Sequence, residues 1–151
     1  VLQECSRDQL VNAYDSSIVE TDHFLNSVIK WLETKEGRAD TAMVYVADHG
    51  ESLGENGIYL HGMPYSIAPD VQKHVPWVTW LSPSMQTRTG ISTGCLQQNM
   101  RDKRISHDSY FHSVLGLLDV QTGLHQLALD VYADCAAATS ASASKKMPLP
   151  G

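Results

Sequence analysis

Residues 48–62, DHGESLGENGIYLHG, place side chains that bind metals among several glycines. Asp48 and His49 are adjacent, and His61 lies twelve positions after His49. A carboxylate oxygen and an imidazole nitrogen suit Zn²⁺, and mixed oxygen and nitrogen sets also accept Mn²⁺. Adjacent side chains point to opposite faces of a strand, but Gly50 permits a turn that lets both reach one ion. We therefore expect Asp48 and His49 to bind a metal, with at least one further ligand from elsewhere.

His61 is expected to contact either a second metal or the substrate, because the glycines before it allow the loop to fold back. Glu51 and Glu55 are weaker candidates. Either is expected to accept a hydrogen bond that fixes a histidine tautomer, or to be an exposed loop carboxylate. His74 precedes the next predicted strand and is placed to face the same site. Three histidines on predicted helices are assigned to solvent or to packing: His23, His107 and His112.

The segments around this stretch predict helices and strands in alternation. Over residues 8–33, apolar side chains recur at spacings of three, four and seven, which indicates an amphipathic helix. Residues 41–47, TAMVYVA, are almost continuously apolar and predict a strand covered on both faces. Residues 74–82 predict a second strand. Asp48 and His49 then follow the carboxyl end of a buried strand, where open α/β sheets bind their ligands.

The C-terminal part of the chain has weaker patterns. Residues 84–104 are polar and predict a loop, and a helix is expected from an N-cap at Ser106 to about Asp119. The apolar patch at 127–135 predicts a short edge strand. Residues 136–151 are small and polar and predict a disordered tail after a single domain at 1–135.

Composition limits the class of partner. The formal net charge of −6 and scattered basic residues argue against nucleic acid, which is bound through clustered Lys and Arg. No apolar run approaches the roughly 20 residues of a membrane-spanning helix, and no secretory signal is visible. Because the sequence starts without Met, we expect it to be part of a longer protein that carries any anchor.

Three cysteines, Cys5, Cys95 and Cys135, match no zinc-finger or CxxC spacing. They are either buried free thiols, or Cys95 pairs with Cys135 and Cys5 with a cysteine upstream. Closing such a loop of about 40 residues would stabilise the fold by roughly 4 kcal/mol on the chain-entropy model. The sequence leaves both alternatives open.

Longer runs of residues carry a specific resemblance. VADHGESLGENGIYLHG, followed by PYSIAPDVQKHVPWVTWLSPS, resembles the core signature of the phosphoethanolamine transferases that modify lipid A, including the mobilised colistin-resistance enzymes. NAYDSSIVETDHFLNSVIKWL resembles the helix that precedes this core in the family, and SHDSYFHSVLGLLDV resembles the one that follows. The resemblance covers roughly residues 5–135.

The resemblance implies a partial alkaline-phosphatase/sulfatase-like α/β/α sandwich, periplasmic and tethered to a bacterial inner membrane by upstream helices. A zinc-bound threonine in this family attacks phosphatidylethanolamine, and the phosphoenzyme passes its head group to a lipid A phosphate, which gives polymyxin resistance. Asp48 and His49 match the zinc-ligand pair, and His61 matches the histidine assigned to the substrate phosphate or a second zinc. The periplasmic location favours a disulfide between Cys95 and Cys135.

The family's nucleophilic threonine and glutamate ligand are expected upstream of this chain. Thr41 lies seven residues before Asp48, about 23 Å along an extended strand. Thr21 lies within a predicted helix, and Ser52 has no base beside it, so we expect the chain alone to be inactive. Two alternatives remain: a phosphoglycerol transferase or sulfatase-like hydrolase of the same superfamily, and a non-catalytic metal-binding module.

Overall fold

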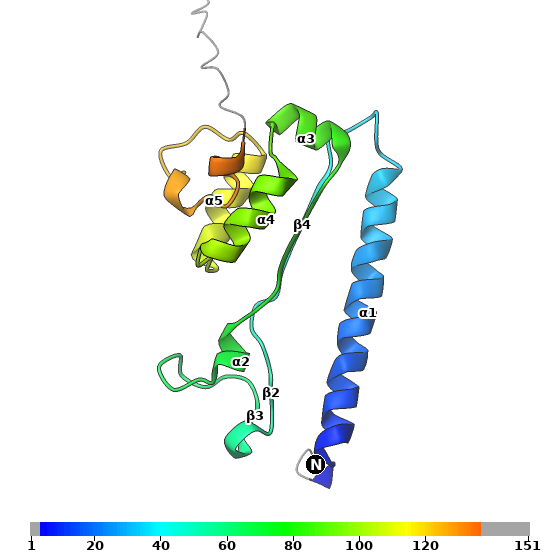
Figure 1. Ribbon diagram of the computed structural model, residues 1–151, viewed down its shortest axis with the longest axis vertical. Helices are drawn as coiled ribbons and strands as arrows, with labels where there is room; N and C mark the ends of the chain where they lie inside the picture. Colours follow the sequence, from blue (N-terminus) through cyan, green and yellow to red (C-terminus); the bar gives the residue numbers. More distant parts are fainter. Residues whose placement is uncertain (1–3, 137–151) are drawn as a thin grey trace, which may run out of the picture. The chain divides into compact units, whose positions relative to one another are not determined.

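The computed structural model describes residues 4–136, which divide into two compact units between Ser84 and Met85 (Figure 1). The predicted tail, apart from Ala136, lies outside the described residues. Among the residues that are described, no helix is both long and apolar enough to cross a membrane.

The first unit begins with the long helix α1 (Arg7–Glu33), as the apolar periodicity predicts. A capping box starts the helix, because Ser6 Oγ accepts from Gln9 N at 3.3 Å and Gln9 Oε1 accepts from Ser6 N at 2.9 Å. No residue of α1 is buried within the described chain. Its exposed large apolar side chains are Ile18, Val19, Phe24 and Trp31.

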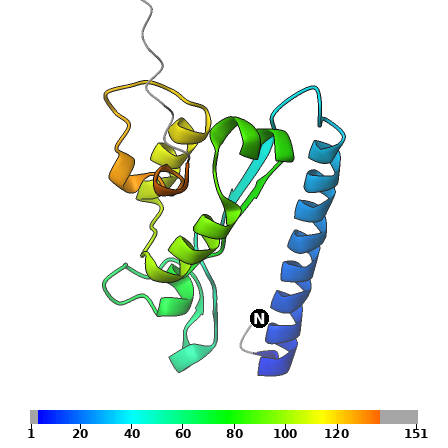
Figure 2. The same ribbon diagram turned by 45° about the horizontal axis from the view of Figure 1, so that its top comes forward.

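Two strands of the first unit, β1 (Ala42–Val46) and β4 (Trp77–Leu81), pair antiparallel, in register from Ala42 opposite Leu81 to Val46 opposite Trp77. They run side by side in both ribbon views (Figures 1 and 2). Both predicted strands are confirmed, but β1 is mostly half-buried, with Met43 its one buried residue. The predicted cover on both faces is therefore not found among the described residues, where β4 is the one strand that pairs with β1.

A short hairpin follows β1 and carries the glycine-rich stretch. β2 (Ser52–Leu53) pairs antiparallel with β3 (Tyr59–Leu60), and the single 3₁₀ turn η2 (Glu55–Gly57) connects them. Gly54 adopts a φ of 108°, a left-handed conformation that glycine tolerates well. The short helix α2 (Asp70–Lys73) then leads back to β4.

Helices dominate the second unit, and two of them correct a prediction. Where residues 84–104 predicted a loop, the structure has α3 (Pro83–Thr89) and α4 (Thr93–Asp102). Both helices are short and mostly polar, so one buried apolar residue each, Met85 and Leu96, left no periodic signal. The hydroxyl of Ser92 caps α4 by accepting from Cys95 N at 3.2 Å.

The predicted helix near residue 106 is confirmed as α5 (Asp108–Leu117), with different ends. The N-cap position is His107 rather than Ser106, although Ser106 Oγ still accepts from Asp108 N at 3.2 Å. At the C-terminus of α5, Asp119 adopts a left-handed conformation with a φ of 54°, and two backbone hydrogen bonds close the last turn of the helix. Such left-handed residues commonly end helices.

The predicted edge strand at 127–135 is wrong. The segment forms two 3₁₀ turns, η3 (Leu127–Leu129) and η4 (Ala133–Cys135). Asp130, between the turns, is buried, and its carboxylate accepts from Tyr132 N at 2.8 Å. Satisfying this carboxylate curls the backbone locally, and η3 lies beside the neighbouring helix α5 instead of in a sheet, with Leu127 67% exposed.

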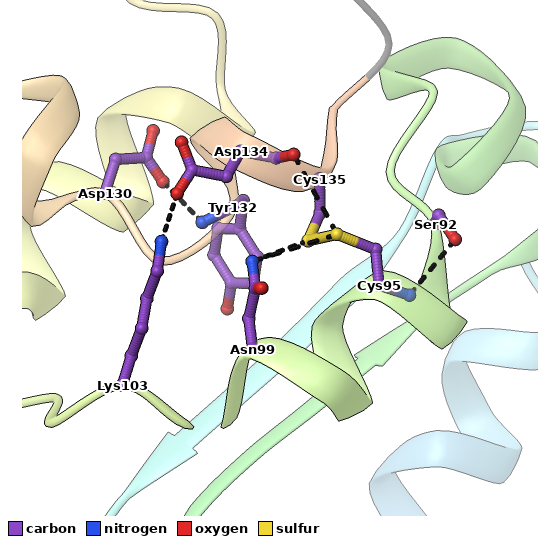
Figure 3. The surroundings of a disulfide bond; sticks show 8 residues. All are labelled: Ser92, Cys95, Asn99, Lys103, Asp130, Tyr132, Asp134 and Cys135. Atoms are coloured by element: carbon purple, nitrogen blue, oxygen red, sulfur yellow. Dashed lines mark hydrogen bonds and ion pairs between the residues drawn. A yellow bond between two sulfur atoms is a disulfide. The ribbon is translucent and has the colours of Figure 1, made fainter. Parts of the chain in front are cut away.

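A disulfide joins Cys95 on α4 to Cys135 on η4 (Figure 3). The paired alternative for these two cysteines is therefore confirmed. Asn99 Nδ2 lies 3.1 Å from Cys135 Sγ, and Lys103 forms an ion pair with Asp134 one residue before the disulfide. Cys5 is exposed and free, so its predicted upstream partner stays a prediction.

Candidate metal centre

The backbone that follows β1 passes close to α2 at Gly50. Gly50 N donates to Gln72 O at 3.0 Å, and a Cβ added to Gly50 would lie 1.9 Å from Val71 O. No other residue type fits there without moving the backbone. This contact lets the chain turn directly after Asp48 and His49, as the glycine at position 50 predicted.

Three side chains gather at this turn: His49, Glu51 and His61, each with a ligand atom within 4.8 Å of the other two. The imidazoles of His49 and His61 stack with their centroids 3.8 Å apart. His61 Nδ1 lies 3.1 Å from Glu51 Oε2. The hairpin β2–β3 causes the encounter, because pairing Ser52 with Leu60 sets the preceding Glu51 beside the following His61.

The donor set fits a divalent cation. Glu51 Oε1 is buried and has no hydrogen-bond partner among the described residues, although buried polar atoms are normally paired. His49 Nδ1 lies 3.0 Å from Gly50 O, so a proton on Nδ1 leaves Nε2 free to bind an ion. The same holds for His61, where Glu51 faces Nδ1. Imidazole nitrogens and carboxylate oxygens within 4.8 Å of one another are the donor types that Zn²⁺ accepts.

Asp48 joins this group through His49. Its Oδ2 lies 3.7 Å from His49 Nε2, and its side chain is 89% exposed. The backbone N–H groups of Asp48 and His49, and then the imidazole of His49, hold the pKa of Asp48 below its ordinary value. The carboxylate is therefore ionised at neutral pH, the form in which it binds metals.

The tertiary structure shows which of the other candidate residues contact the cluster. Glu51 contacts a histidine and Glu55 does not, because Glu55 Oε2 accepts from Leu53 N at 2.8 Å. His74 is exposed and lies outside the cluster. Ser52, which the sequence argues against as a nucleophile, is 2% exposed, and its hydroxyl accepts from Gln72 Nε2 at 2.8 Å.

In the second unit, His112 is buried in packing, as predicted, and Nδ1 accepts from Gln126 N at 3.1 Å. Sequence reasoning missed His125, whose Nε2 lies 3.0 Å from the buried carboxylate of Asp130. Nothing in the local sequence marks this pair, since its members lie five positions apart on either side of the 3₁₀ turn η3.

Comparison with known proteins defines the class. The sulfatase family matches residues 2–120, so the chain belongs to this family. Within it, the chain is 46% identical over 134 residues to phosphoethanolamine transferase EptA of Salmonella typhimurium, covering 89% of this chain and 24% of the relative. It is 42% identical over 122 residues to phosphatidylethanolamine transferase Mcr-2 of Escherichia coli, covering 81% and 21%.

A solved structure agrees. The integral membrane protein lipooligosaccharide phosphoethanolamine transferase A (EptA) of Neisseria meningitidis superposes with a TM-score of 0.85 at 42% identity, over 89% of this chain and 25% of that one. The chain thus spans about a quarter of the length of these relatives. The predicted resemblance and the partial sulfatase-like α/β fold are confirmed.

Proposed function

We propose that this chain is the C-terminal portion of the catalytic domain of a zinc-dependent phosphoethanolamine transferase. The parent protein would move the head group of phosphatidylethanolamine onto a lipid A phosphate, which confers resistance to colistin. The observation that carries the proposal is the cluster of His49, Glu51 and His61 beside Asp48, in a chain related to such transferases.

In this proposal, Asp48 and His49 hold the zinc ion. Bound zinc would offset negative charge on a phosphoryl group and favour the ionised form of a bound hydroxyl. Glu51 accepts the Nδ1 proton of His61 and so leaves His61 Nε2 to contact the substrate phosphate or a second ion. The half-buried Glu51 carboxylate also keeps this imidazole in a fixed orientation.

The nucleophile of the proposed reaction is a threonine in the part of the parent protein upstream of this chain. Neither Ser52 nor Thr41 replaces it, since Ser52 is buried and Thr41 lies at the far end of β1. We therefore propose that the chain alone binds metal but does not turn over substrate.

We place the parent protein at the bacterial inner membrane with this domain in the periplasm. Two observations support this location: a relative described as an integral membrane protein, and a disulfide, which persists in oxidising compartments. The lipids are the proposed partners, and nucleic acid is not.

Zinc calorimetry on the chelator-treated chain tests the metal centre. We expect binding to one ion per chain, lost in Asp48→Ala and in His49→Ala, with His74→Ala as a matched control that retains it. Unchanged affinity in both site variants would contradict the assignment.

A transfer assay tests the reaction. A longer chain that includes the upstream part should move labelled head groups from phosphatidylethanolamine to lipid A, and its His49→Ala variant should not. Release of free phosphoethanolamine with no transfer would favour the hydrolase alternative. Zinc binding without either reaction would favour a metal-binding module.

A further inference from the structure

One buried residue, Gln72, forms hydrogen bonds to both segments that carry the metal-binding cluster. Gln72 on α2 is 7% exposed, and its Nε2 donates to Ser52 Oγ at 2.8 Å and to Leu60 O at 3.1 Å. Its main-chain oxygen accepts from Gly50 N at 3.0 Å. Each of these partners is the sequence neighbour of a cluster residue: Gly50 of His49 and Glu51, Ser52 of Glu51, and Leu60 of His61.

We propose that Gln72 is a positioning residue that sets the relative placement of His49, Glu51 and His61. It touches none of the three side chains through its amide and acts through the backbone and the hydroxyl beside them. The geometric part of this proposal stands without a metal, whereas its consequence for zinc rests on the proposed function.

The chemistry of the position requires an amide. A primary amide nitrogen carries two hydrogens, and here each has one acceptor, Ser52 Oγ and Leu60 O. A carboxylate at position 72 has no hydrogen to donate, and a thioether of similar length removes the donor from both Ser52 Oγ and Leu60 O.

The bond to Leu60 also acts on a strained residue. Leu60 has a φ of 63°, a left-handed conformation that a leucine rarely adopts without support from its surroundings. The turn at Leu60 directs the next residue, His61, to Glu51 and to the stacked ring of His49. Without the amide, Leu60 is expected to relax toward negative φ and to withdraw His61 from the cluster.

The test compares metal-free forms of the 151-residue chain by NMR. In the wild type, imidazole rings 3.8 Å apart should give a nuclear Overhauser effect between His49 and His61 protons. Gln72→Met keeps the side-chain length and removes both donors. Gln97→Met makes the same change at an exposed position of α4 and is the matched control.

We expect Gln72→Met to lose the contact between the two rings while amide signals across β1 and β4 stay in place, and Gln97→Met to change neither. Ser52→Ala removes one of the two bonds without placing sulfur in the site, and should weaken the contact. Retention of the wild-type ring contact in Gln72→Met would overturn the proposal. If Gln72→Met does not fold, an unchanged ring contact in Ser52→Ala overturns it and a weakened contact supports it.

Zinc titration of the same chains separates this proposal from the proposed function. We expect Gln72→Met to bind zinc about 10-fold to 100-fold more weakly than the wild type, as for other residues that orient ligands indirectly. A wild type that binds no zinc, with the ring contact still lost in Gln72→Met, would contradict the metal centre and support the positioning role. Equal zinc affinity in wild type and Gln72→Met, together with an unchanged ring contact, would overturn the positioning role and leave the metal centre standing.

Discussion

The two units of this chain hold their polar groups in place by different means. In the second unit, a disulfide joins α4 to η4, and the half-buried His125 pairs with the buried Asp130. In the first unit, the metal-binding cluster depends on a hairpin whose strands have two residues each. It also depends on the close approach of Gly50 to Val71 O and on the side-chain amide of Gln72. The second unit is thus fastened covalently, whereas the cluster in the first is positioned by weak contacts that a bound ion would reinforce.

The largest expected effect comes from breaking the disulfide. Cys95→Ala with Cys135→Ala removes a crosslink spanning 40 residues, which should lower the free energy of unfolding of the second unit by about 4 kcal/mol. Urea unfolding followed by circular dichroism measures the loss. Zinc affinity in the first unit should stay at the wild-type value, and a parallel loss of zinc binding would show that the units are coupled.

A smaller loss in the free energy of unfolding is expected when the pair between His125 and Asp130 is broken. Asp130→Asn removes the charge that faces His125, where the Asp130 side chain is 3% exposed, and should cost about 1.5–3 kcal/mol, as for hydrogen bonds to charged groups. Asp134→Asn is the matched control, because its ion pair with Lys103 is exposed and worth at most about 1 kcal/mol. Equal urea midpoints for the two variants would show that the pair at Asp130 stabilises the fold no more than the exposed pair at Asp134.

Gly50→Ala tests the contact that turns the chain at the cluster. Its Cβ would lie 1.9 Å from Val71 O, so the backbone must shift, at a cost of about 1–3 kcal/mol, as for overpacking elsewhere. Zinc affinity should fall in the same variant. Gly123→Ala is the control, since its Cβ would meet no atom within 4 Å. Full zinc affinity in Gly50→Ala would mean that this close approach is not needed for the site.

The smallest effect concerns Glu55 in the hairpin. Its own backbone N–H and that of Leu53 hold the pKa of Glu55 below the ordinary value of 4.5. A lowered folded-state pKa contributes stability above pH 4.5, and this stability is lost as the pH falls through the folded-state value. The Leu53 amide signal should therefore shift only in acid below pH 4.5, and Glu55→Gln should abolish that shift. A transition above pH 4.5 would contradict this direction.

Local patterns in the sequence were sufficient for the long or strongly apolar elements. The periodicity of α1 and the apolar runs of β1 and β4 predicted these elements, because each pattern repeats over many residues or is almost unbroken. The helices α3 and α4 were missed, since short polar helices bury too few apolar residues to show a period. At 127–135, one buried carboxylate outweighed an apolar pattern that favoured a strand.

The sequence by itself determined which residue types the site contains. Asp48, His49 and His61 are marked by their chemistry and by the glycines around them, and no fold is needed to recognise them. Only the tertiary structure decided that Glu51 joins them and Glu55 does not, and that Gln72 holds their segments together. The physical reason is that ligand chemistry is a property of single side chains, whereas positioning depends on backbone groups that meet only when the hairpin and α2 have folded.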